Sequence, residues 1–168
     1  ALAVTVIIAL VFVLGISELL QFRRETASLV EGLGRASEEE GLPAWLARLH
    51  PSLRAAVRLR IEGEPVGLPA PVFAPYLVGL LVMLGLLGTF VGMVVTLEGA
   101  VLALTGSADL AAIRNGLAAP IEGLGLAFGT SVAGVAASAA LGLGATLSRR
   151  ERIVATRQLD AVIAGTWR

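Results

Sequence analysis

The sequence predicts an all-α integral membrane protein that crosses a bilayer three times, with its N-terminus outside and its C-terminus in the cytoplasm. Of its 168 residues, 56% are hydrophobic and only 15% are charged, whereas soluble domains carry about 25% charged residues. Three apolar segments reach the length of about 20 residues that an α-helix needs to cross the hydrocarbon core. The 13 basic residues, all of them arginines, are distributed unevenly around these segments.

The first predicted spanning helix covers residues 1–22 and is interrupted only by Glu18. Because the chain begins inside this apolar run and without a methionine, we expect further residues upstream. A cleaved signal peptide is the alternative interpretation. Against it, the segment has no basic start and no small-residue cleavage motif before Arg23.

The second and third predicted spanning helices cover residues 72–104 and 117–147. Glu98 is the first charged residue of the second helix, and Glu122 is the only one of the third. At about 1.5 Å per residue both helices exceed a hydrocarbon core of about 30 Å. We therefore expect them to tilt or to project beyond the bilayer, and we assign residues 71–150 to one two-helix domain.

The positions of the arginines predict the orientation. Seven arginines lie between the first two segments, five follow the third, and only Arg114 lies between the second and third. Cytoplasmic loops are enriched in basic residues, so residues 23–70 and the tail at 151–168 are predicted to be cytoplasmic. The loop at 105–116 is then external. Basic and acidic residues are equal in number and form no basic stripe, which gives no support for nucleic-acid binding.

The cytoplasmic stretch at 23–70 is predicted to be a short helical elbow. Apolar residues recur at helical spacing from Trp45 to Val57, with arginines between them. This pattern is typical of a helix on the inner membrane surface, and equally of a helix that packs on neighbouring subunits. Pro51 is unusual inside a helix and indicates the start of a second one. His50, the only histidine, is interpreted as a surface residue.

Small residues four positions apart recur in the second and third spanning segments. Glycine-rich runs also occur in phosphate-binding loops, but these lie inside apolar helices and have no accompanying lysine. In lipid, small residues at this spacing let two helices approach closely, within one chain or between subunits. The glycines expected at such contacts are Gly85, Gly88, Gly92, Gly125, Gly129, Gly134 and Gly142.

Hydroxyl side chains lie two helical turns apart on the same two helices. Thr89 and Thr96 share one face of the second helix. Ser131 and Ser138 share one face of the third, and Thr130 adds a neighbouring hydroxyl. Two interpretations stay open: the hydroxyls bond to carbonyls of their own helix, or the two faces line a polar interior. Neither helix has an acid or base at mid-membrane, so the chain resembles the wall of a conduit without its titrating group.

Glu98 and Glu122 are predicted near the external ends of these helices, on faces turned away from the hydroxyls. They are either simply solvated or, in a symmetric oligomer, form a ring that collects cations. No nucleophile–base pair and no metal-ligand cluster in the sequence indicates an enzyme, and we expect neither a cofactor nor a bound metal.

Two motifs in these helices resemble those of the MotA/TolQ/ExbB proton-channel family. Residues 84–93, read as LGLLGTFVGM, resemble its GLLGT-x-x-G signature, and the preceding Ala-Pro-Tyr at 74–76 resembles its approach to that helix. Residues 127–134, read as AFGTSVAG, are similar to its last-span motif, with Ser131 in place of the family's threonine. The residues of both motifs are most similar to those of the Zorya-type motor subunit. The resemblance covers about half of the chain.

This resemblance implies a multi-pass subunit of a proton-driven motor or stator in the bacterial inner membrane. Five copies would surround a dimer of a single-span partner of the MotB/TolR/ExbD type. The partner's aspartate would titrate beside Thr89 and Ser131, with H⁺ as the expected ion. Without the resemblance, the same helices fit a non-conducting membrane anchor for a cytoplasmic assembly.

Overall fold

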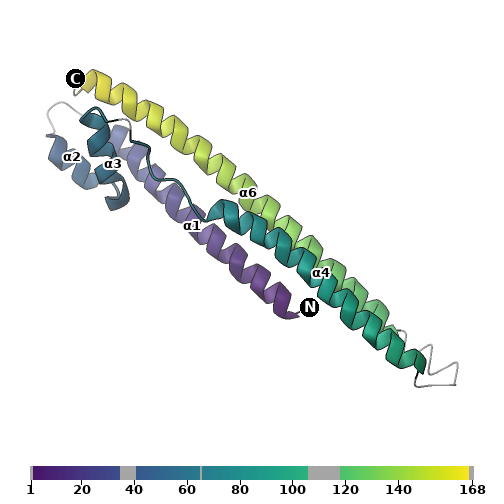
Figure 1. Cartoon of the computed structure of the whole chain (residues 1–168). Coiled ribbons are helices and arrows are strands. Elements are labelled where there is room, and N and C mark those ends of the chain that lie inside the picture. The colour runs from purple at the N-terminus through teal and green to yellow at the C-terminus, as the bar shows by residue number, and fades with distance from the viewer. Residues whose placement is uncertain (1, 35–40, 65, 106–117, 167–168) are drawn as a thin grey trace. The chain divides into compact units, whose positions relative to one another are not determined.

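The computed structural model describes residues 2–34, 41–64, 66–105 and 118–166, and in these ranges it contains helices and no strands. Of the predicted external loop, residues 106–116 lie outside the described residues. The helices of the described ranges are shown in Figure 1: α1 (Leu2–Gly34), α2 (Leu42–Arg48), α3 (Pro51–Ile61), α4 (Ala74–Thr105) and α6 (Ala118–Thr166). The all-α prediction is confirmed.

Three of these helices contain stretches long and apolar enough to cross a membrane, at Leu2–Gly34, Ala74–Leu102 and Gly123–Gly165. The described residues thus contain the three long apolar helices that the sequence predicts, and these candidate spans support a membrane protein. Two of the helices continue beyond the predicted apolar segments. Helix α1 extends past residue 22 to Gly34, and α6 extends past residue 147 to Thr166. Arginine, glutamate, glutamine, alanine and leucine dominate these extensions and favour helix, so the end of an apolar run is not the end of the helix.

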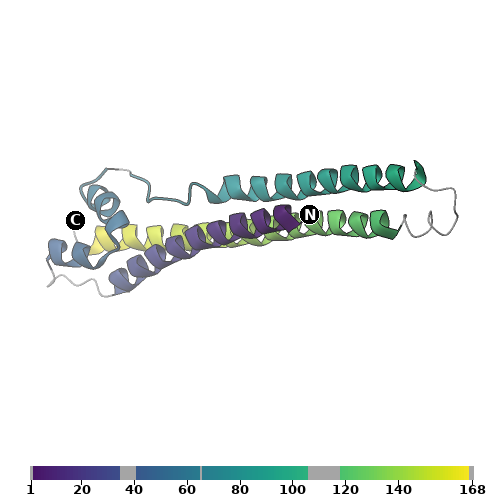
Figure 2. The same ribbon diagram turned by 90° about the horizontal axis from the view of Figure 1, so that it is seen from below.

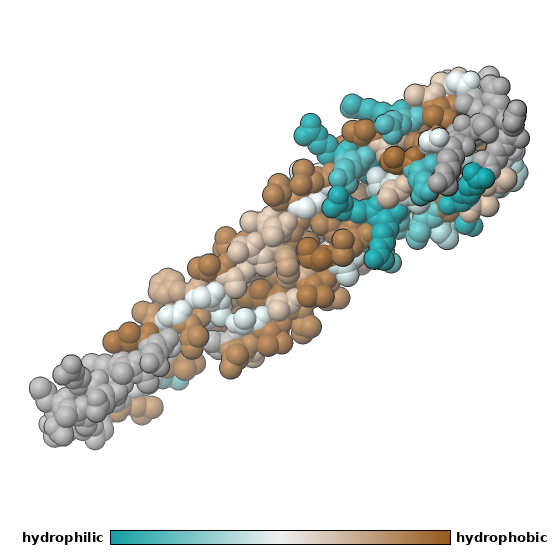
Figure 3. Space-filling model, turned by 180° about the vertical axis from the view of Figure 1, so that it is seen from behind, coloured by the Kyte–Doolittle hydropathy of each residue, from teal (hydrophilic) through white to brown (hydrophobic). Residues whose placement is uncertain are grey.

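The chain divides into two compact units, which we describe separately. Unit 1 comprises residues 1–15 and 75–142, and unit 2 comprises residues 16–74 and 143–168. On the face seen in Figure 3, apolar side chains cover unit 1, whereas hydrophilic ones gather over unit 2. The sequence-based boundaries at residues 22, 70 and 150 follow hydropathy rather than packing and stay a prediction.

In unit 1, α4 and the first part of α6 pack side by side and antiparallel (Figure 2). Gly85 lies against Gly134 near the middle of this contact. Towards the ends of the contact, Gly92 meets Ala127 and Val78 faces Gly142. The buried residues in this first part of α6 recur every three or four positions, as expected for one face of a helix. They are Ala127, Thr130, Gly134, Ser138 and Leu141.

Unit 2 has a hydrophobic core built by four helices. Its fully buried centre is Trp45 of α2, whose indole Nε1 donates a hydrogen bond of 2.8 Å to the carbonyl oxygen of Gly32 in α1. The apolar residues that the sequence placed on one helical face are buried here against the chain's own α1 and α6. The core consists of Leu29, Trp45, Leu49, Leu53, Val57, Ala155, Leu159 and Ile163. Neither a bilayer surface nor a neighbouring subunit is needed to cover this face.

A tight turn separates α2 from α3. Pro51 is the first residue of α3, where its missing N–H removes no helical hydrogen bond. The exposed side chain of His50 caps the helix by accepting a hydrogen bond from the backbone N–H of Ser52. Arg60 near the end of α3 forms a bidentate ion pair with Asp160 of α6, at 2.6 and 3.0 Å. These hydrogen bonds raise the pKa of the Arg60 guanidinium above its ordinary value, so this link stays charged.

Candidate functional site

The candidate site is the contact between α4 and α6 in unit 1, where the two sequence motifs pack against each other. A Cβ atom built on Gly134 would lie 2.7 Å from the carbonyl oxygen of Leu81 and 2.8 Å from the Cα of Gly85. Both obstacles are backbone atoms, which cannot rotate away as a side chain can. The two helices therefore touch through their main chains at this point, an approach that only glycine permits.

Two further glycines of α4 continue this contact along the helix. A Cβ on Gly88 would lie 2.6 Å from the Thr130 hydroxyl oxygen, and one on Gly92 would overlap the Cβ of Ala127. Val4 of α1 also reaches Gly88. We call the row of Gly85, Gly88, Gly92, Ala127, Thr130 and Gly134 the glycine seam.

The other three glycines of the predicted set lie outside this seam. Gly142 faces Val78 at an ordinary van der Waals distance of 3.8 Å, so its position has room for a small side chain. Gly125 and Gly129 are exposed, and a Cβ built on either would meet no other helix of the described residues within 4 Å. The small residues of α6 thus occupy two faces, one closed by α4 and one open.

Four of the five predicted hydroxyls bond to carbonyl oxygens of their own helix. The pairs are Thr89 with Gly85 at 3.0 Å, Thr130 with Ala127 at 2.7 Å, Ser138 with Val135 at 2.9 Å, and Thr96 with Gly92. The exception is Ser131, whose hydroxyl has no hydrogen-bond partner in the described part of the chain. In a single copy, local bonding therefore accounts for most of the hydroxyl pattern.

Burial separates these hydroxyls into two groups. Thr130 and Ser138 are only 3% and 6% exposed, so they lie inside the packed unit. Thr89, Thr96 and Ser131 are half-buried at the margin of the seam. The two residues that the resemblance assigns to the pore, Thr89 and Ser131, both belong to this marginal group.

Two hollows flank Thr96, between the later part of α4 and the start of α6. They measure about 350 and 310 Å³, and Thr96 and Pro120 line both. Glu98 is exposed and lines neither hollow. The side chain of Glu122 lies outside the described part of the structure, so its expected role in ion collection stays a prediction, as does that of Glu98.

Unit 2 holds a buried charge that sequence reasoning missed. Arg152 is 5% exposed, and its Nε donates to the Thr26 hydroxyl at 2.8 Å. Its Nη2 reaches the Glu25 carboxylate at 3.3 Å, and its guanidinium carbon lies 4.2 Å from the centroid of the Phe22 ring. In the sequence, Arg152 stands out only as one of the five arginines that follow the third apolar segment. The three-and-four spacing of buried positions along α6 places it on the packed face and could have revealed it.

The fold and this geometry define a helical membrane protein with three candidate spans and a hydroxyl-flanked glycine seam. Comparison with known proteins identifies no relative, since no family model, no curated protein and no solved structure matches the chain.

Proposed function

We propose that this chain is the pore-forming subunit of an ion-driven motor or stator complex that couples H⁺ flow across the bacterial inner membrane to mechanical work. One observation above all supports the proposal. The two motifs that resemble the MotA/TolQ/ExbB family, distant in sequence, pack against each other through Gly85 and Gly134. Their hydroxyls at Thr89 and Ser131 lie at the margin of this contact, where a further helix can reach them.

The proposed assembly is a ring of five copies around a dimer of a single-span partner of the MotB/TolR/ExbD type. A partner is needed because α4 and the apolar part of α6 carry no acid at mid-membrane that could titrate. The open face at Gly125 and Gly129 gives another membrane helix a place for close approach. The number of copies comes from the family resemblance alone.

The two marginal hydroxyls suit the two protonation states of a carboxyl group. Thr89 already donates to the Gly85 carbonyl, which leaves its lone pairs free to accept from a protonated acid. Ser131 has no partner in the described chain, so its O–H is free to donate to an ionised carboxylate. Together they would stabilise the partner's aspartate before and after proton transfer.

The test compares Thr89→Val and Ser131→Ala with Ser138→Ala, a control whose hydroxyl is buried within the chain. A hydrogen bond is worth about 0.5–1.5 kcal/mol between neutral groups and about 1.5–3 kcal/mol to a charged one. Repeated around a ring, its loss should reduce ion-driven activity strongly, at least tenfold, in the two marginal variants. We expect Ser138→Ala to stay close to wild type. The measurement is gradient-dependent activity with the single-span partner at matched membrane levels, and full activity in both marginal variants would refute the pore assignment.

The alternative is a non-conducting anchor for a cytoplasmic assembly. It is favoured by the bonding of four hydroxyls to their own helices, which needs no pore to explain it. Reconstitution of the chain with its partner in liposomes separates the two functions, because only a conduit dissipates an imposed pH gradient. A neighbouring reading frame for a single-span protein with an aspartate at the start of its span would favour the motor.

A further inference from the structure

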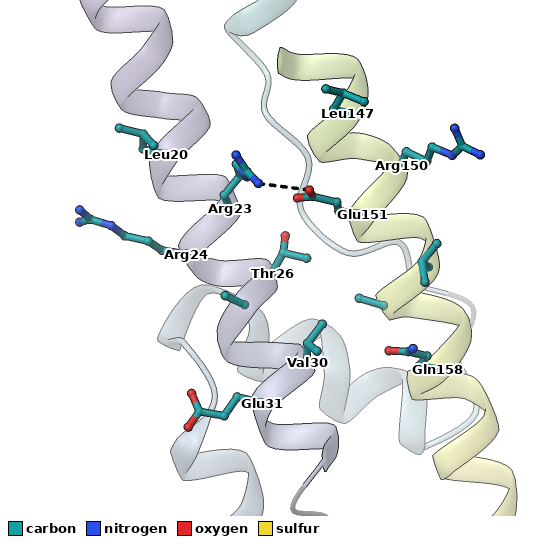
Figure 4. Close-up of a pocket in the computed structure, with 13 residues that line it drawn as sticks. Leu20, Arg23, Arg24, Thr26, Val30, Glu31, Leu147, Arg150, Glu151 and Gln158 are labelled. Atoms are coloured by element: carbon teal, nitrogen blue, oxygen red, sulfur yellow. Dashed lines mark hydrogen bonds and ion pairs between the residues drawn. The ribbon is translucent and has the colours of Figure 1, made fainter. Parts of the chain in front are cut away.

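In unit 2, an open groove of about 980 Å³ lies between α1 and α6 (Figure 4). Its apolar lining includes Leu20 and Val30 of α1 and Leu147 and Val154 of α6. Basic side chains interrupt this lining at one level along the two helices, so the groove is apolar and cationic at once.

The basic residues lie where the two apolar stretches end. Arg23 and Arg24 directly follow the apolar run of α1, and Arg150 lies just beyond that of α6. If both runs cross the membrane, these three arginines lie at the level of the lipid headgroups. Above them, Leu20 and Leu147 remain 50% and 53% exposed, on the side that faces the hydrocarbon core.

The arginines are not neutralised by the chain itself. Arg23 extends across the groove to Glu151, with 3.2 Å between Nη2 and Oε1, whereas the side chains of Arg24 and Arg150 point away from the groove in opposite directions (Figure 4). Neither Arg24 nor Arg150 has an ion-pair or hydrogen-bond partner among the described residues. Three arginines and one glutamate lie at this level of the groove, which leaves an excess of two positive charges. Glu31, which also lines the groove, lies two turns further along α1.

We propose that this groove binds an anionic phospholipid. Its phosphate is held by Arg24, Arg150 and Arg23, and an acyl chain lies along Leu20 and Leu147. Guanidinium groups bind phosphate oxygens with paired hydrogen bonds, and basic pockets between membrane helices are typical sites for such headgroups. Arg24 and Arg150 are exposed and have long stems, so both can turn to a headgroup above the groove. A soluble anion would leave the exposed leucines uncovered, which favours a lipid as the occupant.

The experiment titrates the purified full chain in neutral detergent with phosphatidylglycerol or phosphatidylcholine and counts bound lipids by native mass spectrometry. We expect retention of phosphatidylglycerol over phosphatidylcholine. The double variant Arg24→Gln/Arg150→Gln should weaken phosphatidylglycerol binding about 25-fold, or about fivefold for each arginine, the equivalent of roughly 1 kcal/mol per residue. Circular dichroism should show unchanged helix content, because both side chains are exposed.

The matched control is Arg149→Gln/Arg157→Gln, which removes the same charge from positions that do not line the groove. It should stay within about twofold of wild type. Equal losses in the two double variants would overturn the proposal, as would equal binding of the two lipids. Displacement of the lipid by millimolar inorganic phosphate would reduce the site to a simple anion site and also overturn it. Finally, efficient cross-linking between copies through a cysteine at Val154, in membranes rich in phosphatidylglycerol, would show that a second chain fills the groove.

Discussion

A single buried cation, Arg152, links two helices of unit 2. Removing a guanidinium from water is unfavourable, and the cost is offset only where hydrogen bonds and an opposite charge replace the lost hydration. Thr26, Phe22 and Glu25 provide these contacts from α1, within about one turn of that helix. The contacts therefore fix how α1 and α6 are aligned along their length within this unit.

The variant Arg152→Met tests this role. Loss of the cation leaves the mostly buried carboxylate of Glu25 without its partner, and breaking such a pair costs about 3–5 kcal/mol. We expect a clearly lower midpoint of thermal unfolding, measured by circular dichroism of the protein in detergent. The double variant Arg152→Met/Glu25→Met should recover part of the loss, because no charge then stays buried alone. Arg157→Met, on the exposed side of α6, serves as the control, and an equal effect there would contradict this account.

Among the secondary-structure elements, the long helices were easier to predict than the short ones. Hydropathy alone predicts α4 closely, since its ends coincide with the ends of an apolar run. It fails at the far end of α6, where the exposed Arg157 and Gln158 lie between the buried Ala155 and Leu159. The partners of α2 and α3 could not be read from the sequence. An amphipathic face reveals that something covers it, but not whether that is lipid, another subunit or the chain itself.

The glycine seam, too, could be predicted only in part from the sequence. The spacing of the glycines predicts close helix contacts, but the sequence cannot tell which of them meet within one chain. Gly125 and Gly129 have the same spacing as Gly88 and Gly92, yet only the second pair packs within the described chain. The hydroxyls had two open interpretations for a similar reason, because a serine or threonine bonds either to its own helix or to a neighbour.

The short helix α2 is predicted to be held against the rest of unit 2 by Trp45. Trp45→Ala removes a fully buried indole, a change that costs about 3–5 kcal/mol in a packed core. Trp45→Phe keeps most of the packing and loses the hydrogen bond to the Gly32 carbonyl, which is worth about 1 kcal/mol. We expect limited proteolysis between α1 and α3 to be fast in the alanine variant and only slightly faster in the phenylalanine variant. Equal rates for all three proteins would show that α2 is not held by this contact.

For the molecule as a whole, the arginine distribution predicts its orientation in the membrane. The chain has no cysteine, so single cysteines can report on it directly. Thr105 at the end of α4 and Ser52 in α3 are both exposed and suit this purpose. A cysteine at Thr105 should react with an impermeant maleimide added to intact cells, and one at Ser52 only after the cells are lysed. The reverse pattern would overturn the orientation and, with it, the proposed motor function.

The main-chain contact between Gly85 and Gly134 also has a consequence for entropy. Side chains that are buried in a contact lose rotamer freedom, at up to about 2 kcal/mol for the longest ones, but glycine has none to lose. Helices α4 and α6 can therefore come together here without freezing any torsion beyond those of the helical backbone. The contact also has no rotamers through which it could loosen gradually, so the two helices either touch at this point or separate outright.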